Sequence, residues 1–66
     1  MSHKLVRAII AEGVIKLIME NRKVSQDMAL DMFYGSKIAE SFADDETGLY
    51  GQSALYIFSL FEEEQK

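Results

Sequence analysis

The fold of this chain is decided by the stretch Asp44-Asp45-Glu46-Thr47-Gly48-Leu49-Tyr50-Gly51-Gln52-Ser53, which separates two apolar, helix-like halves. It holds two of the four glycines and three consecutive acids. Glycine and short polar side chains favour turns, because they tolerate the backbone angles that turns require. We therefore predict a turn whose acids face water. Thr47 and Ser53 would act as caps, while Leu49 and Tyr50 would reach the core.

The acids of this turn superficially resemble a cation-binding loop. A calcium loop of the EF-hand kind needs acids at alternating positions and a glutamate at the twelfth, whereas Asp44, Asp45 and Glu46 are adjacent. We therefore predict a solvated turn without a metal. If Leu49 is buried, Leu49→Ala should cost roughly 2–4 kcal/mol of stability. Asp44→Ala should change little.

On the C-terminal side of the turn, Ser53 is a suitable N-cap for a last helix over 53–64. Residues 54–61 are apolar almost all round, which is typical of a helix buried on several sides. Tyrosine, isoleucine and phenylalanine also favour strands, so a strand is the competing interpretation. We prefer the helix, because no second strand is predicted nearby and the glutamates that follow favour helices.

On the N-terminal side, residues 4–21 carry a helical pattern. The apolar residues that recur at three- and four-residue steps are Val6, Ile9, Ile10, Val14, Leu17 and Ile18. Leu5, Ile15 and Met19 widen this stripe beyond what one small neighbouring helix would cover. Gly13 lies in the middle of the pattern, where glycine costs about 1 kcal/mol relative to alanine. It either lets another helix approach closely or is simply tolerated.

Two shorter helices are predicted between these segments. Asn21, Arg22 and Lys23 are expected to end the first helix, where Asn21 tolerates a left-handed turn. Ser25 is expected to cap the next helix, over 25–35. Gly35 ends or bends that helix, and Ser36 can cap a third over 36–43. Whether the second and third helices are continuous stays open at this point. The predicted fold is an all-α bundle of three or four helices, about 4–21, 25–35, 36–43 and 53–64, in a single domain, 1–66.

The amino-acid composition argues against several classes of function. The net charge of −4 argues against nucleic-acid binding, which needs cations for phosphates. The apolar window from Leu5 to Met19 is too short and too charged to span a membrane or to serve as a leader, which favours a cytoplasmic protein. The chain has no cysteine, and its one histidine, His3, is near the N-terminus. We therefore expect no enzyme activity and no catalytic, cofactor-binding or metal-binding residues.

A surplus of apolar surface favours protein–protein contact. The chain of 66 residues is 48% hydrophobic and has no disulfide to stabilise it, and so short a chain rarely gains more than about 3–5 kcal/mol from its own core. We therefore predict a homo-oligomer, most simply a homodimer. The predicted interaction surface consists of Val6, Ile10, Gly13, Leu17, Tyr34, Tyr50, Tyr56 and Phe61.

Three segments carry a family resemblance: residues 29–36, 45–50 and 52–56. Together they resemble a group of small, uncharacterised, all-helical bacterial proteins of the domain-of-unknown-function kind. The resemblance covers roughly the last 45 residues, although Ala54 stands where a proline is expected. It implies no activity, but it implies an antitoxin-like role beside a partner protein encoded nearby.

We therefore expect a cytoplasmic helical protein–protein interaction module. The alternative is a DNA-binding regulator that uses a helix-turn-helix-like segment over 25–43. Its second helix carries only one cation, Lys37, and one anion, Glu40, whereas a reading helix needs several hydrogen-bond donors.

Overall fold

The computed structural model describes residues 4–44 and 48–65, and in these ranges the chain is all-α. Its helices are α1 (Lys4–Arg22), α2 (Gln26–Tyr34), α3 (Lys37–Ala43), the short 3-10 helix η2 (Leu49–Gly51) and α4 (Ala54–Gln65). The predicted α-helical fold is confirmed, with each predicted end within one residue of the observed one. The strand interpretation of residues 54–61 is wrong, because these residues form most of α4.

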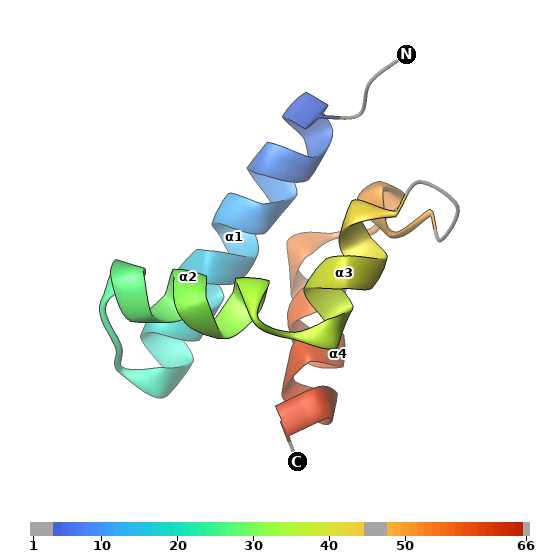
Figure 1. Cartoon of the computed structure of the whole chain (residues 1–66). Coiled ribbons are helices and arrows are strands. Elements are labelled where there is room, and N and C mark those ends of the chain that lie inside the picture. The colour runs from blue at the N-terminus through green and yellow to red at the C-terminus, as the bar shows by residue number, and fades with distance from the viewer. Residues whose placement is uncertain (1–3, 45–47, 66) are drawn as a thin grey trace.

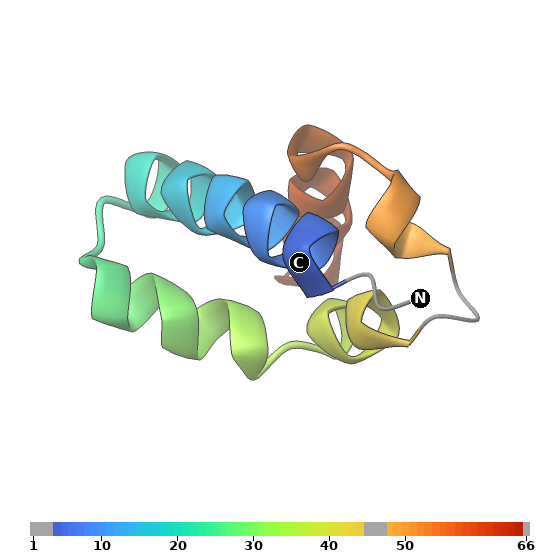
Figure 2. The ribbon, with the colours of Figure 1, turned by 90° about the horizontal axis from the view of Figure 1, so that it is seen from above.

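The four α-helices form a ring in which each packs against its neighbours in the chain, and α4 closes the ring against α1. Seen from above, α1 lies between α2 and α4, and α3 lies on the far side of the ring (Figure 2). The helix α1 is the longest, with 19 residues. Its N-terminal half rises away from the rest of the bundle (Figure 1).

The core is built around Phe33 of α2, which is fully buried. Its ring lies tilted against that of Phe61 of α4, with the ring centres 6.4 Å apart, and meets that of Phe42 of α3 edge-on at 6.3 Å. Edge-to-face contacts of this kind are favourable because the positive ring edge meets the negative face. The helix α1 adds Val14 and Ile18, both fully buried. All four α-helices therefore contribute side chains to one core.

Ser36 separates α2 from α3, so the two are not one continuous helix. Its Oγ accepts a hydrogen bond from the backbone N–H of Ala39 at 3.2 Å, which caps the first turn of α3. The same hydroxyl donates to the carbonyl oxygen of Phe33 at 2.5 Å, which satisfies the end of α2. Ser25 and Ser53 act as predicted, because their Oγ atoms accept from the N–H groups of Met28 and Tyr56.

The end of α1 differs from the prediction. The left-handed residue is Lys23, with φ of 57°, and not Asn21. Asn21 stays helical and its Nδ2 donates to the carbonyl oxygen of Leu17 at 2.8 Å. The backbone N–H of Val24 donates to the carbonyl oxygen of Met19 at 3.3 Å. This five-residue step back is the Schellman arrangement, which places the left-handed residue after the last helical one.

The turn that precedes α4 is described from Gly48 onward. Gly48 adopts a left-handed conformation, φ 69°, which glycine accepts without a Cβ clash. Leu49 packs against the core but is only half-buried. The loss of stability expected for Leu49→Ala is therefore about 1–2 kcal/mol, less than for a fully buried leucine. Thr47, with the acids Asp45 and Glu46, lies outside the described residues, and so does the side chain of Tyr50.

Candidate interaction surface

The N-terminal half of α1 projects from the bundle. The buried residues of α1 all lie in its C-terminal part: Ala11, Val14, Ile15 and Ile18. None of the residues 4–10 is buried. Seven helical residues correspond to about 10 Å of helix. Its exposed residues, Leu5, Val6, Ala8 and Ile9, form one broad side of the helix, while Ile10 on the other side packs against the core.

The projecting segment exposes large apolar side chains. Leu5 is 74% exposed, Ile9 62% and Val6 44%. Residues four apart lie one above the other on a helix, so Leu5 and Ile9 share one line along α1, and Val6 flanks it. We call these three residues the α1 face. Single exposed apolar residues are common, but a contiguous group of them marks an interaction site.

The first turn of α4 lies beside the α1 face. A Cβ added to Gly13 would come within 2.8 Å of the Cβ of Ala54, so the two backbones approach closely at this point. Ile9 is one turn before Gly13 on the same side of α1. Leu55, which follows Ala54, is 67% exposed. The α1 face therefore continues towards apolar surface on a second helix.

The predicted surface residues do not form one patch. Val6, Tyr34 and Tyr56 are exposed. Tyr34, however, lines a groove with Ala8 and Ala11, on the side of α1 that faces away from Val6.

Four of the predicted residues serve the fold instead. Phe61 is a correction, because it is fully buried in the core that α4 shares with the other helices. Ile10 and Leu17 are half-buried against the same core. Gly13 makes an internal contact with Ala54.

The prediction missed Leu5, Ile9 and Leu55, which are the most exposed large apolar residues near α1. The signal for Leu5 was present in the sequence, since it made the apolar stripe wider than one neighbour could cover. Ile9 was taken as part of the inward stripe. Which side of that stripe faces inward depends on where α2 and α4 pack, and the periodicity of α1 does not contain this information.

A groove of about 410 Å³ separates α1 from α3 along the projecting segment. Its walls include Ala8 and Ala11 of α1 and Ala39 and Ala43 of α3. Because alanine side chains are short, the two helices are not packed tightly here. The long side chains of Lys4 and Arg7 also line this groove, and the Nε and Nη2 atoms of Arg7 are shielded from solvent.

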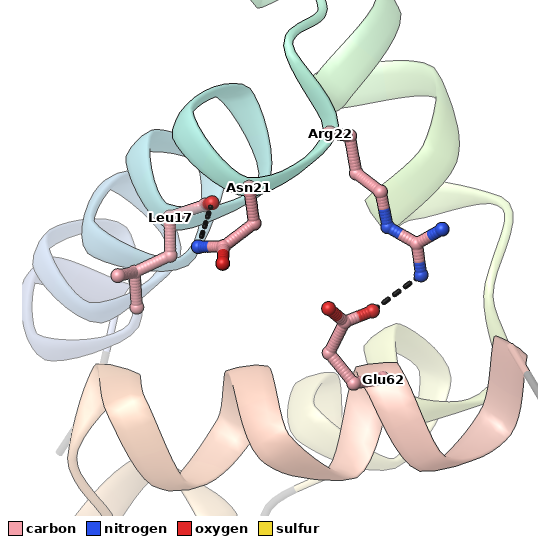
Figure 3. Close-up of polar contacts among 4 residues, drawn as sticks. All are labelled: Leu17, Asn21, Arg22 and Glu62. Carbon is pink, nitrogen blue, oxygen red and sulfur yellow. Dashed lines mark hydrogen bonds and ion pairs between the residues drawn. The ribbon is translucent and has the colours of Figure 1, made fainter.

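The opposite end of α1 is held by a polar contact. The guanidinium of Arg22 forms an ion pair with the carboxylate of Glu62 in α4 (Figure 3). Asn21, beside it, donates to the carbonyl oxygen of Leu17 within α1 (Figure 3). Surface ion pairs typically contribute about 1 kcal/mol or less. The pair fixes the register of α1 on α4 at this end and leaves the other end open.

The start of α3 is occupied by an acid from α4. The carboxylate of Glu64 accepts hydrogen bonds from the backbone N–H groups of Lys37, at 2.8 Å, and Ile38, at 2.9 Å. In a helix-turn-helix protein, the N-terminal residues of the second helix contact the DNA. Here an anion already holds that position, which argues against the DNA-binding alternative.

The described residues contain neither a metal-ligand group nor a membrane-spanning helix. Among residues 4–44 and 48–65, no three acids or histidines are grouped as a metal site would need. Within the same residues, none of the helices combines the length and the apolar character needed to cross a membrane. No protein-family model matches this chain, and searches of curated proteins and of solved structures find no significant similarity. The family resemblance of residues 29–56 therefore remains an untested prediction.

Proposed function

We propose that this protein is a cytoplasmic, non-enzymatic protein–protein interaction module that self-associates through the α1 face. The observation that supports this is the exposure of Leu5, Val6 and Ile9 on a helix segment without buried residues. Burying a Leu or Ile side chain that was exposed to water contributes about 1.5–3 kcal/mol of favourable free energy. Association would therefore gain this free energy from the exposed side chains of each copy.

The expected dimer is weak. The α1 face and Leu55 together form a small apolar surface, whereas a standard stable interface covers about 800 Å² on each partner. The interaction is therefore expected in the micromolar range or weaker. Association of this strength suits a module that exchanges partners.

Sedimentation equilibrium over a wide concentration range tests the proposal. The unmodified chain should increase in mean mass with concentration, and Leu5→Lys/Ile9→Lys should remain monomeric. A matched control is Met28→Lys, which places a lysine at an exposed apolar position of α2 away from the α1 face and should associate like the unmodified chain. Circular dichroism verifies that the variants are folded. A mass that stays monomeric at every concentration refutes the proposal.

A second form of the proposal has a different protein as the partner, in the manner of an antitoxin that binds a toxin-like neighbour. Its support is that α2 also exposes Met28 and Tyr34, residue types that interfaces favour, and that the chain is acidic. Co-expression with the products of adjacent genes, followed by purification of the complex, is the test. Met28→Lys/Tyr34→Lys should weaken that complex, while an unchanged complex would contradict a role for α2.

A further inference from the structure

The exposed side of α1 has the spacing of a coiled-coil seam. Leu5, Ile9, Glu12 and Lys16 follow one another at steps of four, three and four residues, and all four are exposed. Val6 and Ala8 flank the first two, and both are also exposed. A seam with this spacing packs against a second helix, with the flanking residues covering its edges. The apolar part of the seam lies entirely in the projecting segment.

Charge distinguishes the two ways in which identical helices can pair about a two-fold axis. In a parallel pair, Glu12 would face Glu12 of the other copy and Lys16 would face Lys16. Like charges opposed in this way are unfavourable. The positive N-terminal ends of both α1 helices would also lie side by side. A parallel pair therefore buries the apolar residues at an electrostatic cost.

An antiparallel pair centred near position 7 avoids these contacts. Leu5 of each copy then faces Ile9 of the other, and Val6 and Ala8 cover the edges. Glu12, whose largely exposed side chain lies 3.7 Å from the Nζ of Lys16 in the same helix, comes to lie beside the N-terminal end of the partner's α1. The first turn of α1 contains no acid and begins with Lys4, so an anion there is favourable. The arrangement is reciprocal.

A register further along the helix is less favourable. Centring the pair between Ile10 and Ala11 would place Ile9 against Glu12 and Leu5 against Lys16. The apolar side chains would then face charges, and little apolar surface would be buried. In the register near position 7, the apolar residues of the seam face each other and Glu12 lies near a positive helix end. This register is therefore the more favourable one.

We infer that two copies of this chain dock antiparallel through the N-terminal halves of α1, with Leu5 of each copy against Ile9 of the other. The inference rests on the self-association proposed above and specifies its geometry. In this register the N-terminal segment of each α1 covers the exposed apolar side chains of the other. The apolar surfaces of the two bundles then form one continuous buried surface across the two-fold axis.

Single cysteines test the geometry, since the chain has no cysteine of its own. Ala8→Cys should be linked efficiently by a short bifunctional maleimide, because the two copies of residue 8 lie close to the axis. Lys16→Cys should not be linked, since antiparallel pairing separates the two copies by about 27 Å at a rise of 1.5 Å per residue. Linking of both variants would establish a parallel pair and overturn the inference while leaving self-association intact.

The charge of Glu12 gives an independent readout. Glu12→Gln should weaken association about three- to tenfold in an antiparallel pair, because two contacts with a helix N-terminus are lost. In a parallel pair the same change removes a repulsion and tightens association. Glu20→Gln, which removes an exposed acid of α1 farther from the axis, is the matched control and should change association little. If the unmodified chain dimerises but neither cysteine variant is linked, another face is used and the inference is wrong. A chain that is monomeric throughout refutes the proposed function itself.

Discussion

At the scale of single residues, Gly13 shows how packing can reverse an intrinsic preference. Alanine normally stabilises the middle of a helix by about 1 kcal/mol relative to glycine. At this position the new Cβ would lie 2.8 Å from the Cβ of Ala54, which is closer than real Cβ contacts. Overpacking costs about 1–3 kcal/mol, so we expect Gly13→Ala to lower the free energy of unfolding. Urea denaturation measures the change.

The control for Gly13 is its contact partner. Ala54→Gly removes the opposing methyl group, so Gly13→Ala/Ala54→Gly should recover part of the stability that Gly13→Ala loses. A double-mutant cycle isolates this coupling. If Gly13→Ala alone is stabilising, α1 and α4 are not in close contact at this point.

Lys23 adopts a backbone conformation that favours glycine. Its φ of 57° places it in the left-handed region, where a Cβ costs about 1–2 kcal/mol. Glycine removes that cost but adds flexibility to the unfolded chain, so we expect Lys23→Gly to stabilise the protein by about 0.5–1 kcal/mol. Thermal unfolding measures this. Lys23→Ala should have little effect, because alanine keeps the Cβ; a gain with alanine would contradict the backbone explanation.

At the scale of helices, Glu64 connects the end of α4 to the start of α3. Its carboxylate accepts from two backbone N–H groups of α3, which has only seven residues. Hydrogen bonds to a charged acceptor at a helix start are stabilising, so Glu64→Ala should lose about 1–2 kcal/mol. Glu64→Gln should lose less, because it keeps one oxygen acceptor. Glu20→Ala, a change of an exposed acid in α1, serves as the control.

Amide exchange locates the effect of Glu64. The N–H groups of Lys37 and Ile38 should lose protection in Glu64→Ala before those of α2 do. An equal loss in all helices would mean that the variant unfolds globally, and that the bonds to Glu64 do not hold α3 specifically.

The helix ends show what the sequence could and could not predict. Ser25, Ser36 and Ser53 were identified as caps because a cap needs only the residues next to it. The sequence identified the glutamates at the end of α4 only as residues that favour a helix. In the structure Glu62 pairs with Arg22, and Glu64 caps α3. These partners are 40 and 27 residues away in the chain, so local patterns could not reveal them.

At the scale of the whole molecule, the same limit applies to the interaction surface. The helical period identified α1 and the width of its apolar stripe. It did not determine which side the other helices cover. Leu5 and Ile9 became surface residues because the other helices cover the opposite side of α1, which carries Ala11, Val14 and Ile18. Phe61 became a core residue because α4 packs against α1 and α3.

The N-terminal segment of α1, residues 4–10, should be the part of the molecule that responds to concentration. Short helical segments with few tertiary contacts are marginally stable in water, and in this segment no residue is fully buried, although Ile10 packs against the core. In the monomer, the amides of Ala8, Ile9 and Ile10 should therefore exchange through local opening. Docking of a second copy covers Leu5 and Ile9 and should slow this exchange as the protein concentration rises.

Hydrogen exchange followed by NMR at low and high protein concentration measures this response. Amides of Val14 and Ile18, in the supported half of α1, should change less, because their local environment is already packed. In Leu5→Lys/Ile9→Lys the concentration dependence should disappear while the core amides keep their protection. If residues 8–10 are equally protected at both concentrations in the unmodified chain, the projecting segment is stable in the monomer. Docking of a second copy is then not needed to stabilise it.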